Sequence, residues 1–143
     1  MYAATASAPL VNSGRRTGVV AGRITTSLAA VFLIFDGGAK VLKAKQVIDA
    51  TAQLGFPVQT IPLIGTLLLL STLVYVIPQT ALLGAVLLTG YLGGAIAVQL
   101  RVGNPLFETI FPVFVAMAIW GGLLLRDPGL RALVRPRRRD ETV

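Results

Sequence analysis

Five polar side chains lie near the ends of apolar stretches and have the chemistry needed to bind a small molecule. They are Asp36, Lys40, Gln99, Arg101 and Glu108, which we name the polar cluster. Brought together, two carboxylates, an amine, an amide and a guanidinium would form a pocket for a small polar or anionic head group. Ionisable groups within a membrane are costly and are therefore functional candidates by default. We take the polar cluster as the candidate binding site.

A simpler interpretation of the same residues stays open. Asp36 and Lys40 are four residues apart, so they share one helix face if a helix continues through the two glycines between them. An exposed pair of this kind contributes only about 0.2–0.5 kcal/mol to helix stability. Arg101 would then only extend toward lipid head groups. The polar cluster would in that case be an ordinary polar surface.

Two aromatic residues, Tyr91 and Trp120, combine a flat ring with a polar group. Trp120 lies near the middle of the last apolar stretch, away from the membrane interfaces where tryptophan is enriched. Together they could line a cavity for a flat ring such as a quinone. The alternative is that Trp120 fills space against Gly93 and Gly94. Quinone is the one cofactor that we keep open.

Most catalytic chemistry is excluded by side chains that the sequence lacks. It contains no cysteine and no histidine, which removes disulfides, thiol redox chemistry and the usual ligands of zinc and haem. The usual general base near neutral pH is missing for the same reason. No glycine-rich phosphate loop, catalytic carboxylate pair or nucleophile triad is present. We therefore expect no catalytic residue and no metal site, which favours a protein that is not an enzyme.

Four apolar stretches must position these side chains. They are Gly18–Phe35, Ile61–Ile77, Ala81–Val98 and Ile110–Leu125. At a rise of about 1.5 Å per residue, each is about as long as the hydrocarbon layer of a membrane is thick. The chain has 143 residues, of which 55% are hydrophobic and 13% charged, whereas about a quarter are charged in ordinary globular domains. The pattern predicts an all-α integral membrane protein, a four-helix transmembrane bundle with spans at about 18–38, 61–77, 81–99 and 109–125.

The segment Lys43–Leu54, between the first two spans, is amphipathic. Its apolar face follows helical spacing through Val47, Ile48, Thr51 and Leu54. Gly55 and Pro57 then stand where glycine and proline end helices. We expect a short interfacial helix at about 43–54 that lies in the plane of the membrane surface. A helix packed over the mouth of the bundle is the alternative, and the two are compatible.

The third span is rich in small residues. Gly90 and Gly94 form a G-x-x-x-G motif, which allows a neighbouring backbone to approach closely. We expect this motif to be used for packing inside the bundle rather than for dimerisation. The turn before the span contains Pro78 and Thr80, and Thr80 is expected to cap the N-terminus of the third helix. The second and third spans then form an antiparallel hairpin.

Charge distribution predicts the topology. The four-span domain covers residues 17–127, between a disordered tail at 1–16 and a basic tail at 128–143. Eight basic residues flank the side that holds both termini and four flank the other, which places both tails in the cytoplasm of a multi-pass protein of the bacterial plasma membrane. The net charge of +7 therefore indicates topology, not nucleic-acid binding. Expected partners are membrane lipids, with anionic head groups at the basic C-terminal tail, and a membrane protein or second copy of the chain.

Several segments together resemble the DoxX-like family of small bacterial membrane proteins. They are Phe35–Leu42, Ala50–Pro57, Thr89–Ala95, Arg101–Phe107, Phe111–Val113 and Trp120–Leu123 with Leu125–Asp127. The resemblance covers about residues 18 to 134 and implies a four-helix membrane bundle. Some members of the wider family are tied to quinone-linked oxidation of sulfur compounds and others to oxidative-stress complexes. Many DoxX-like members have no assigned activity.

The chain also departs from this family pattern. Relatives often have a histidine where Gln99 stands, another near Glu108 and Thr109, and a proline where Ala44 stands. If those histidines serve proton or quinone chemistry, this chain lacks it. We therefore expect first a non-catalytic membrane component or interaction subunit. The alternatives are a quinone-linked redox accessory protein and a carrier of a small solute or lipid head group.

Overall fold

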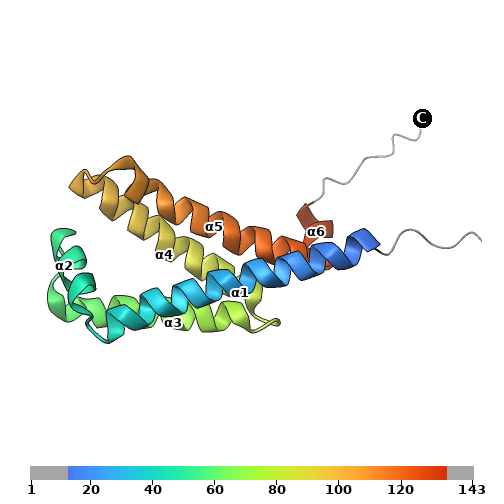
Figure 1. Ribbon diagram of the computed structural model, residues 1–143, viewed down its shortest axis with the longest axis horizontal. Coiled ribbons are helices and arrows are strands. Elements are labelled where there is room, and N and C mark those ends of the chain that lie inside the picture. The colour runs from blue at the N-terminus through green and yellow to red at the C-terminus, as the bar shows by residue number, and fades with distance from the viewer. Residues whose placement is uncertain (1–12, 135–143) are drawn as a thin grey trace, which may run out of the picture.

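The computed structural model describes residues 13–134 of the chain, and this part contains helices and no strand (Figure 1). The helices are α1 (Ser13–Val41), α2 (Lys45–Gln53), the 3-10 turn η1 (Val58–Thr60), α3 (Ile61–Val76), α4 (Ala81–Val102), α5 (Leu106–Arg126) and α6 (Pro128–Val134). Four segments of the described chain are helical, long and apolar enough to cross a membrane: they are most of α1, η1 with α3, α4, and α5. The predicted all-α four-helix membrane bundle is therefore confirmed.

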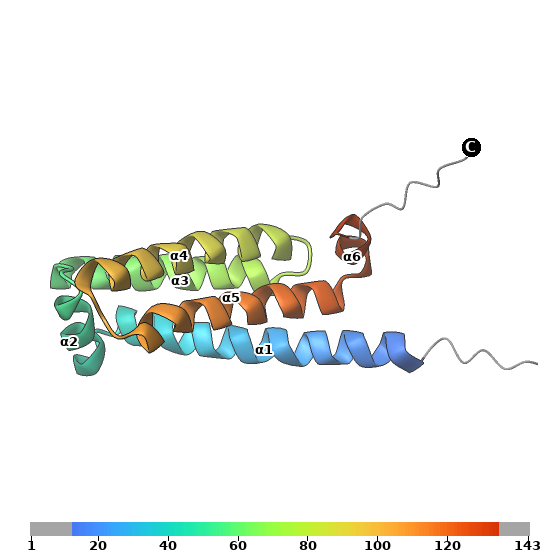
Figure 2. The same cartoon turned by 90° about the horizontal axis from the view of Figure 1, so that it is seen from above.

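The four long helices form a ring in which each packs against two neighbours. Helix α1 contacts α3 and α5, and α4 contacts the same two helices from the opposite side (Figure 2). Large apolar side chains cover the outward faces: Leu28 is 68% exposed and Leu63 is 61% exposed. Lipid can solvate such faces, because the hydrocarbon layer is as apolar as leucine itself.

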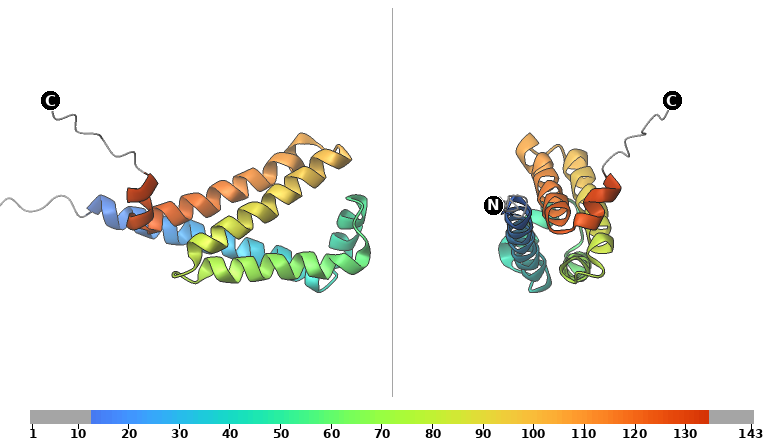
Figure 3. Two further views of the ribbon diagram at one scale, coloured as in Figure 1. Left: turned by 180° about the vertical axis from the view of Figure 1, so that it is seen from behind. Right: turned by 90° about the vertical axis from the view of Figure 1, so that its right-hand side faces the viewer.

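The helix pairs α1/α3 and α4/α5 diverge along the length of the bundle (Figure 3). They lie close together where α1 begins and α5 ends, which we name the terminal end. They separate toward the opposite end, where α2 lies, which we name the α2 end. The helix backbones of the two pairs therefore lie farther apart at the α2 end than at the terminal end (Figure 3).

Glycines without side chains allow the helices to meet at the terminal end. A Cβ atom on Gly84 of α4 would lie 2.2 Å from the backbone nitrogen of Tyr75 in α3. A Cβ on Gly22 of α1 would lie 2.7 Å from the backbone nitrogen of Arg126, and one on Gly122 would lie 2.7 Å from the hydroxyl of Thr26. Both helix contacts therefore depend on small residues, as close packing within membranes generally does.

The short helix α6 is fixed to the end of α5 by side chains. The Asp127 carboxylate accepts hydrogen bonds from the backbone nitrogens of Gly129 at 2.9 Å and Leu130 at 3.1 Å, and Pro128 occupies the first turn. This arrangement is a helix N-cap followed by proline at the first position. Arg131 Nε in turn donates to the carbonyl oxygen of Leu124 at 2.6 Å, which satisfies one of the free carbonyls at the end of α5.

Several boundaries differ from those expected from the sequence. Helix α1 begins at Ser13, so residues 13–16 of the expected disordered tail are helical, and part of the expected basic tail forms α6. The remainder of both tails, residues 1–12 and 135–143, lies outside the described residues. Helix α1 also continues past residue 38 to Val41, and Gly37 within it is packed against α3, where a Cβ would lie 2.9 Å from Leu69.

Thr80 occupies the N-cap position of α4, as predicted, but its side chain does not cap that helix. Instead its hydroxyl donates to the carbonyl oxygen of Val74 at 2.8 Å, at the end of the preceding helix. A carbonyl left free at the C-terminus of α3 competes successfully for this hydroxyl.

Candidate functional site

A cavity of about 470 Å³ lies between the two helix pairs at the α2 end. All four long helices line it, together with α2 and the loop that follows α2. Most of its wall is apolar and includes Phe32, Leu33, Leu67, Leu92, Val98 and Val115. Large aromatic side chains separate α1 from α5 at this level, since the Phe32 and Phe111 rings meet edge to face with centroids 5.7 Å apart. Large side chains thus lie between α1 and α5 at the α2 end, whereas glycines let the same two helices meet at the terminal end.

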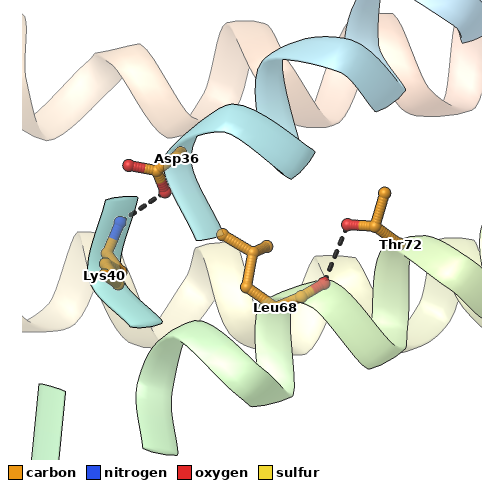
Figure 4. A network of polar contacts seen from close by, with 4 residues as sticks. All are labelled: Asp36, Lys40, Leu68 and Thr72. Carbon is orange, nitrogen blue, oxygen red and sulfur yellow. Dashed lines mark hydrogen bonds and ion pairs between the residues drawn. The ribbon is translucent and has the colours of Figure 1, made fainter. Parts of the chain in front are cut away.

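Polar groups also reach this cavity. The ammonium group of Lys40 forms an ion pair with the carboxylate of Asp36, one helical turn earlier in α1 (Figure 4). Both side chains line the cavity, as do Thr51, Tyr91 and Gln99. Because Asp36 and Lys40 neutralise each other, the pair adds polarity to the cavity without adding net charge.

The hydroxyl groups of α3 do not share this role. Thr72 is buried, and its hydroxyl donates to the carbonyl oxygen of Leu68 in the same helix at 2.8 Å (Figure 4). Ser71 and Thr66 bond to carbonyls of α3 in the same way. Such local bonds satisfy hydroxyl groups inside an apolar layer without any ligand.

Three of the cavity's polar side chains, those of Thr51, Tyr91 and Gln99, have hydrogen-bonding groups that no described residue uses. The Tyr91 hydroxyl makes no hydrogen bond to any other residue within 13–134. The side-chain oxygen of Gln99 accepts a hydrogen bond from the Asn104 side chain, whereas its amide nitrogen donates to none of the described residues. Two hydroxyls and an amide nitrogen are therefore free to bind a polar group of a ligand in this cavity.

The structure brings only part of the polar cluster together. Asp36, Lys40 and Gln99 line the cavity, but Arg101 and Glu108 do not. Arg101 lies three residues after Val98 and seven after Gly94, so it shares their helix face beyond the cavity, and its side chain is exposed. Glu108 is exposed in the first turn of α5. Both residues share a helix face with lining residues, Arg101 with Val98 and Glu108 with Phe111, but they lie nearer the end of the bundle, so their position along the helix axis keeps them outside the cavity.

The two candidate aromatic residues are also separated. Tyr91 lines the cavity, whereas Trp120 is not among the lining residues. Trp120 Nε1 instead donates to the hydroxyl of Thr89 at 2.9 Å, which joins α5 to α4. Its expected packing against Gly93 and Gly94 is not observed either, because neither glycine has an atom within 4 Å of its Cβ position. Trp120 therefore has a structural contact in place of the expected site role.

The predicted use of the G-x-x-x-G motif inside the bundle is wrong. Neither Gly90 nor Gly94 has a neighbouring atom within 4 Å of the position of a Cβ, and both line the cavity. The helix pairs have already diverged at this level, so no backbone approaches these glycines. Their lack of side chains enlarges the cavity instead.

The amphipathic segment contributes to the cavity from the α2 end. Thr51 of α2 is buried and lines the cavity, together with Leu54 and Phe56 just after the helix. Thr51 and Leu54 belong to the apolar face expected from the sequence. Helix α2 thus covers the α2 end of the bundle, as the alternative interpretation predicted. Leu54 and Phe56 belong to the segment that follows α2, and helical spacing does not predict that Phe56 lines the cavity.

These features define the class of protein: a four-helix membrane protein with a largely apolar cavity between its helix pairs that contains a few polar groups. The model of the DoxX-like family matches residues 24–122, from within α1 to within α5. The chain therefore belongs to the DoxX-like family. No curated protein and no solved structure matches the chain. Among the described residues, no group of three or more acidic, histidine or cysteine side chains is placed to hold a metal ion.

Proposed function

We propose that this protein is a non-catalytic membrane component that binds one amphipathic molecule in the cavity between its helix pairs. The observation that carries the proposal is the polarity of the cavity: an apolar space with two free hydroxyls and a free amide nitrogen. Its volume of about 470 Å³ falls within the range of about 300–1,000 Å³ that is typical of small-molecule sites.

The arrangement of the cavity walls supports an amphipathic ligand rather than a small polar solute. An apolar body would lie against side chains such as Leu67 and Val115, which offer no hydrogen bond. A polar head would lie beside Tyr91 and Gln99, which have unused donors. A free polar solute would leave most of the wall without favourable contacts and would lose its own hydration.

The side chains at the cavity support binding without catalysis. Asp36 is already engaged by Lys40, and the remaining groups are an amide and two hydroxyls. None of these is an ordinary general base or nucleophile near neutral pH. The chain also contains no histidine and no cysteine.

A quinone is the second candidate ligand, and the aromatic lining favours it. Four aromatic side chains line the cavity: Phe32, Phe56, Tyr91 and Phe111. A flat ring could stack on these side chains, and its carbonyl oxygens could accept hydrogen bonds from Tyr91 and Gln99. The protein would then be an accessory to quinone-linked redox chemistry.

The proposal is tested by ligand binding to the purified protein in a mild detergent. Native mass spectrometry and thermal unfolding would be measured with single-chain lipids and with quinone analogues. The proposal expects one molecule to bind per protein and to raise the melting temperature. Binding of single-chain lipids would support an amphipathic lipid as the ligand, and binding of quinone analogues would support a quinone. If neither kind of ligand binds, the proposal is overturned.

Two matched substitutions in α4 test whether the ligand binds in the cavity. Gly90 lines the cavity and Gly93 does not, yet both have open space at their Cβ positions. We expect Gly90→Leu to fill the cavity and to lower affinity at least about tenfold, a loss of about 1.4 kcal/mol. Gly93→Leu should leave the affinity unchanged. Equal effects of the two substitutions would place the ligand outside the cavity.

We also propose that both termini face the cytoplasm and that the protein lies in the plasma membrane. In the sequence, eight basic residues flank the spans on the side of the two termini and four flank them on the other side. Because the chain has no cysteine, single cysteines can report the topology in intact cells. A membrane-impermeant thiol reagent should label Gln59→Cys, at the α2 end, but not Gln79→Cys in the α3–α4 turn. Labelling of Gln79→Cys but not of Gln59→Cys would show that the topology is the opposite one.

A further inference from the structure

We infer that the bound amphiphile carries an anionic head group and that the guanidinium of Arg101 recognises it. This inference rests on the proposed function, because it concerns the same cavity.

The position of Arg101 supports this role. It lies in the last turn of α4, and its Nη2 atom is 3.3 Å from the position that a Cβ on Gly55 would occupy. Gly55 stands between Leu54 and Phe56, which both line the cavity. The Arg101 side chain therefore reaches from α4 to the loop that closes the α2 end of the cavity. A ligand head that extends past Gln99 would come within reach of the guanidinium.

The hydrogen-bonding state of Arg101 distinguishes it from two arginines at the terminal end. Arg126 Nη2 donates to the carbonyl oxygen of Tyr75 at 3.2 Å, and Arg131 Nε donates to the carbonyl of Leu124 at 2.6 Å. The protein itself uses both of those side chains. Arg101 forms no hydrogen bond and no ion pair with any residue in 13–134. Its donors are free for a ligand.

The charges near the cavity leave Arg101 uncompensated. Lys40 and Asp36 form the one ion pair within the described residues, and they cancel each other. The other charged side chains of α2 and of the α5 start are exposed and unpaired: Lys45, Asp49 and Glu108. A guanidinium presents several donors in a rigid fork that matches the oxygens of a carboxylate or a phosphate. A carboxylate or phosphate on an apolar chain therefore fits this site.

The test compares ligands that share one acyl chain and differ in charge. Oleate, oleoyl lysophosphatidic acid and uncharged monoolein would be titrated into the purified protein in a nonionic detergent. We expect both anionic ligands to bind about tenfold or more tightly than monoolein, as a charge-assisted hydrogen bond to Arg101 requires. Arg101→Gln should lower the affinity for the anionic ligands to that for monoolein, and Arg101→Lys should keep part of the preference.

Lys45→Gln is the matched control, because it removes one positive charge at the same end of the bundle without touching Gly55. It should leave the preference for anionic ligands unchanged. Equal affinities for charged and uncharged ligands would overturn the role of Arg101, and so would a loss of preference in Lys45→Gln as large as that in Arg101→Gln. Both results would leave the proposed function standing. No binding of any amphiphile would overturn both. Displacement of oleate by inorganic phosphate alone would show a site for free anions and would contradict an amphiphilic ligand.

Discussion

The terminal end and the α2 end of the bundle differ in the hydrogen bonds that their buried or partly buried tyrosine hydroxyls make. At the terminal end, the hydroxyl of Tyr75 donates to the carbonyl oxygen of Ile119 at 2.9 Å and lies 3.3 Å from the hydroxyl of Thr26. The guanidinium of Arg126 lies over its ring, 5.3 Å from the centroid. At the α2 end, the hydroxyl of Tyr91 has no hydrogen-bond partner within the described residues.

This comparison separates the part of the bundle that holds the helices together from the part that can accept a ligand. Polar atoms in an apolar layer need partners, because each unsatisfied group costs free energy. Tyr75 obtains its partners from α1 and α5 and thereby joins three helices. Tyr91 can obtain one from a bound molecule. We therefore expect substitutions at the terminal end to change stability and substitutions at the α2 end to change binding.

The largest effect on stability is expected from Gly84→Ala. The added methyl group would lie 2.2 Å from the nitrogen and 2.3 Å from the Cα of Tyr75, and backbone atoms cannot move aside as a flexible side chain can. We expect a loss of about 3 kcal/mol of unfolding free energy, measured by thermal or denaturant unfolding in detergent. Gly93→Ala, in the same helix with open space at its Cβ, should change stability by less than about 0.5 kcal/mol. Comparable losses at both positions would contradict the packing described for the terminal end.

A smaller effect is expected from removal of one hydroxyl at each end. Tyr75→Phe deletes the bond to Ile119 and the contact with Thr26, so stability should fall by about 1–2 kcal/mol while ligand affinity stays constant. Tyr91→Phe should leave stability within about 0.5 kcal/mol and weaken ligand binding several-fold, about 1 kcal/mol. Unfolding and binding would be measured on the same preparations. If Tyr91→Phe destabilises as much as Tyr75→Phe does, the two ends do not differ as described.

The smallest effect is expected from Trp120→Phe. The substitution removes the hydrogen bond from Nε1 to Thr89 but keeps most of the apolar ring. Because this bond lies between α4 and α5 and is exposed, we expect a loss of about 0.5 kcal/mol in stability. Quinone and lipid titrations should give unchanged affinities. A clear loss of quinone binding would instead place Trp120 in the site.

The architecture was largely predictable from the sequence, and the cavity was not. Four long apolar stretches predict four spans because a membrane of fixed thickness sets their length. The pairing of Asp36 with Lys40 follows from their spacing once the helix is known to continue through the two glycines. Apolar periodicity, by contrast, cannot tell the face of a span that meets lipid from the face that meets another helix.

The glycines illustrate this most clearly. Gly22, Gly84 and Gly122 pack against neighbouring helices, whereas Gly90 and Gly94 line the cavity and have open space at their Cβ positions. All five look alike in the sequence, and the most conspicuous motif is the one that makes no helix contact. Which small residue lies at a crossing depends on the angles between helices, and these depend on distant bulky residues such as Phe111. Nor does the sequence show how far along α4 and α5 the cavity extends, and Arg101 and Glu108 lie beyond it.

Photo-cross-linking tests most directly the claim that the cavity at the α2 end binds an amphiphile. The protein in nanodiscs would be incubated with a single-chain amphiphile that carries a diazirine in its acyl chain, irradiated and digested. We predict saturable adducts on cavity-lining residues such as Leu92 and Val115. Unlabelled amphiphile and the substitution Gly90→Leu should both suppress these adducts. Adducts spread over outward-facing residues such as Leu28 and Leu63, and insensitive to both, would contradict it.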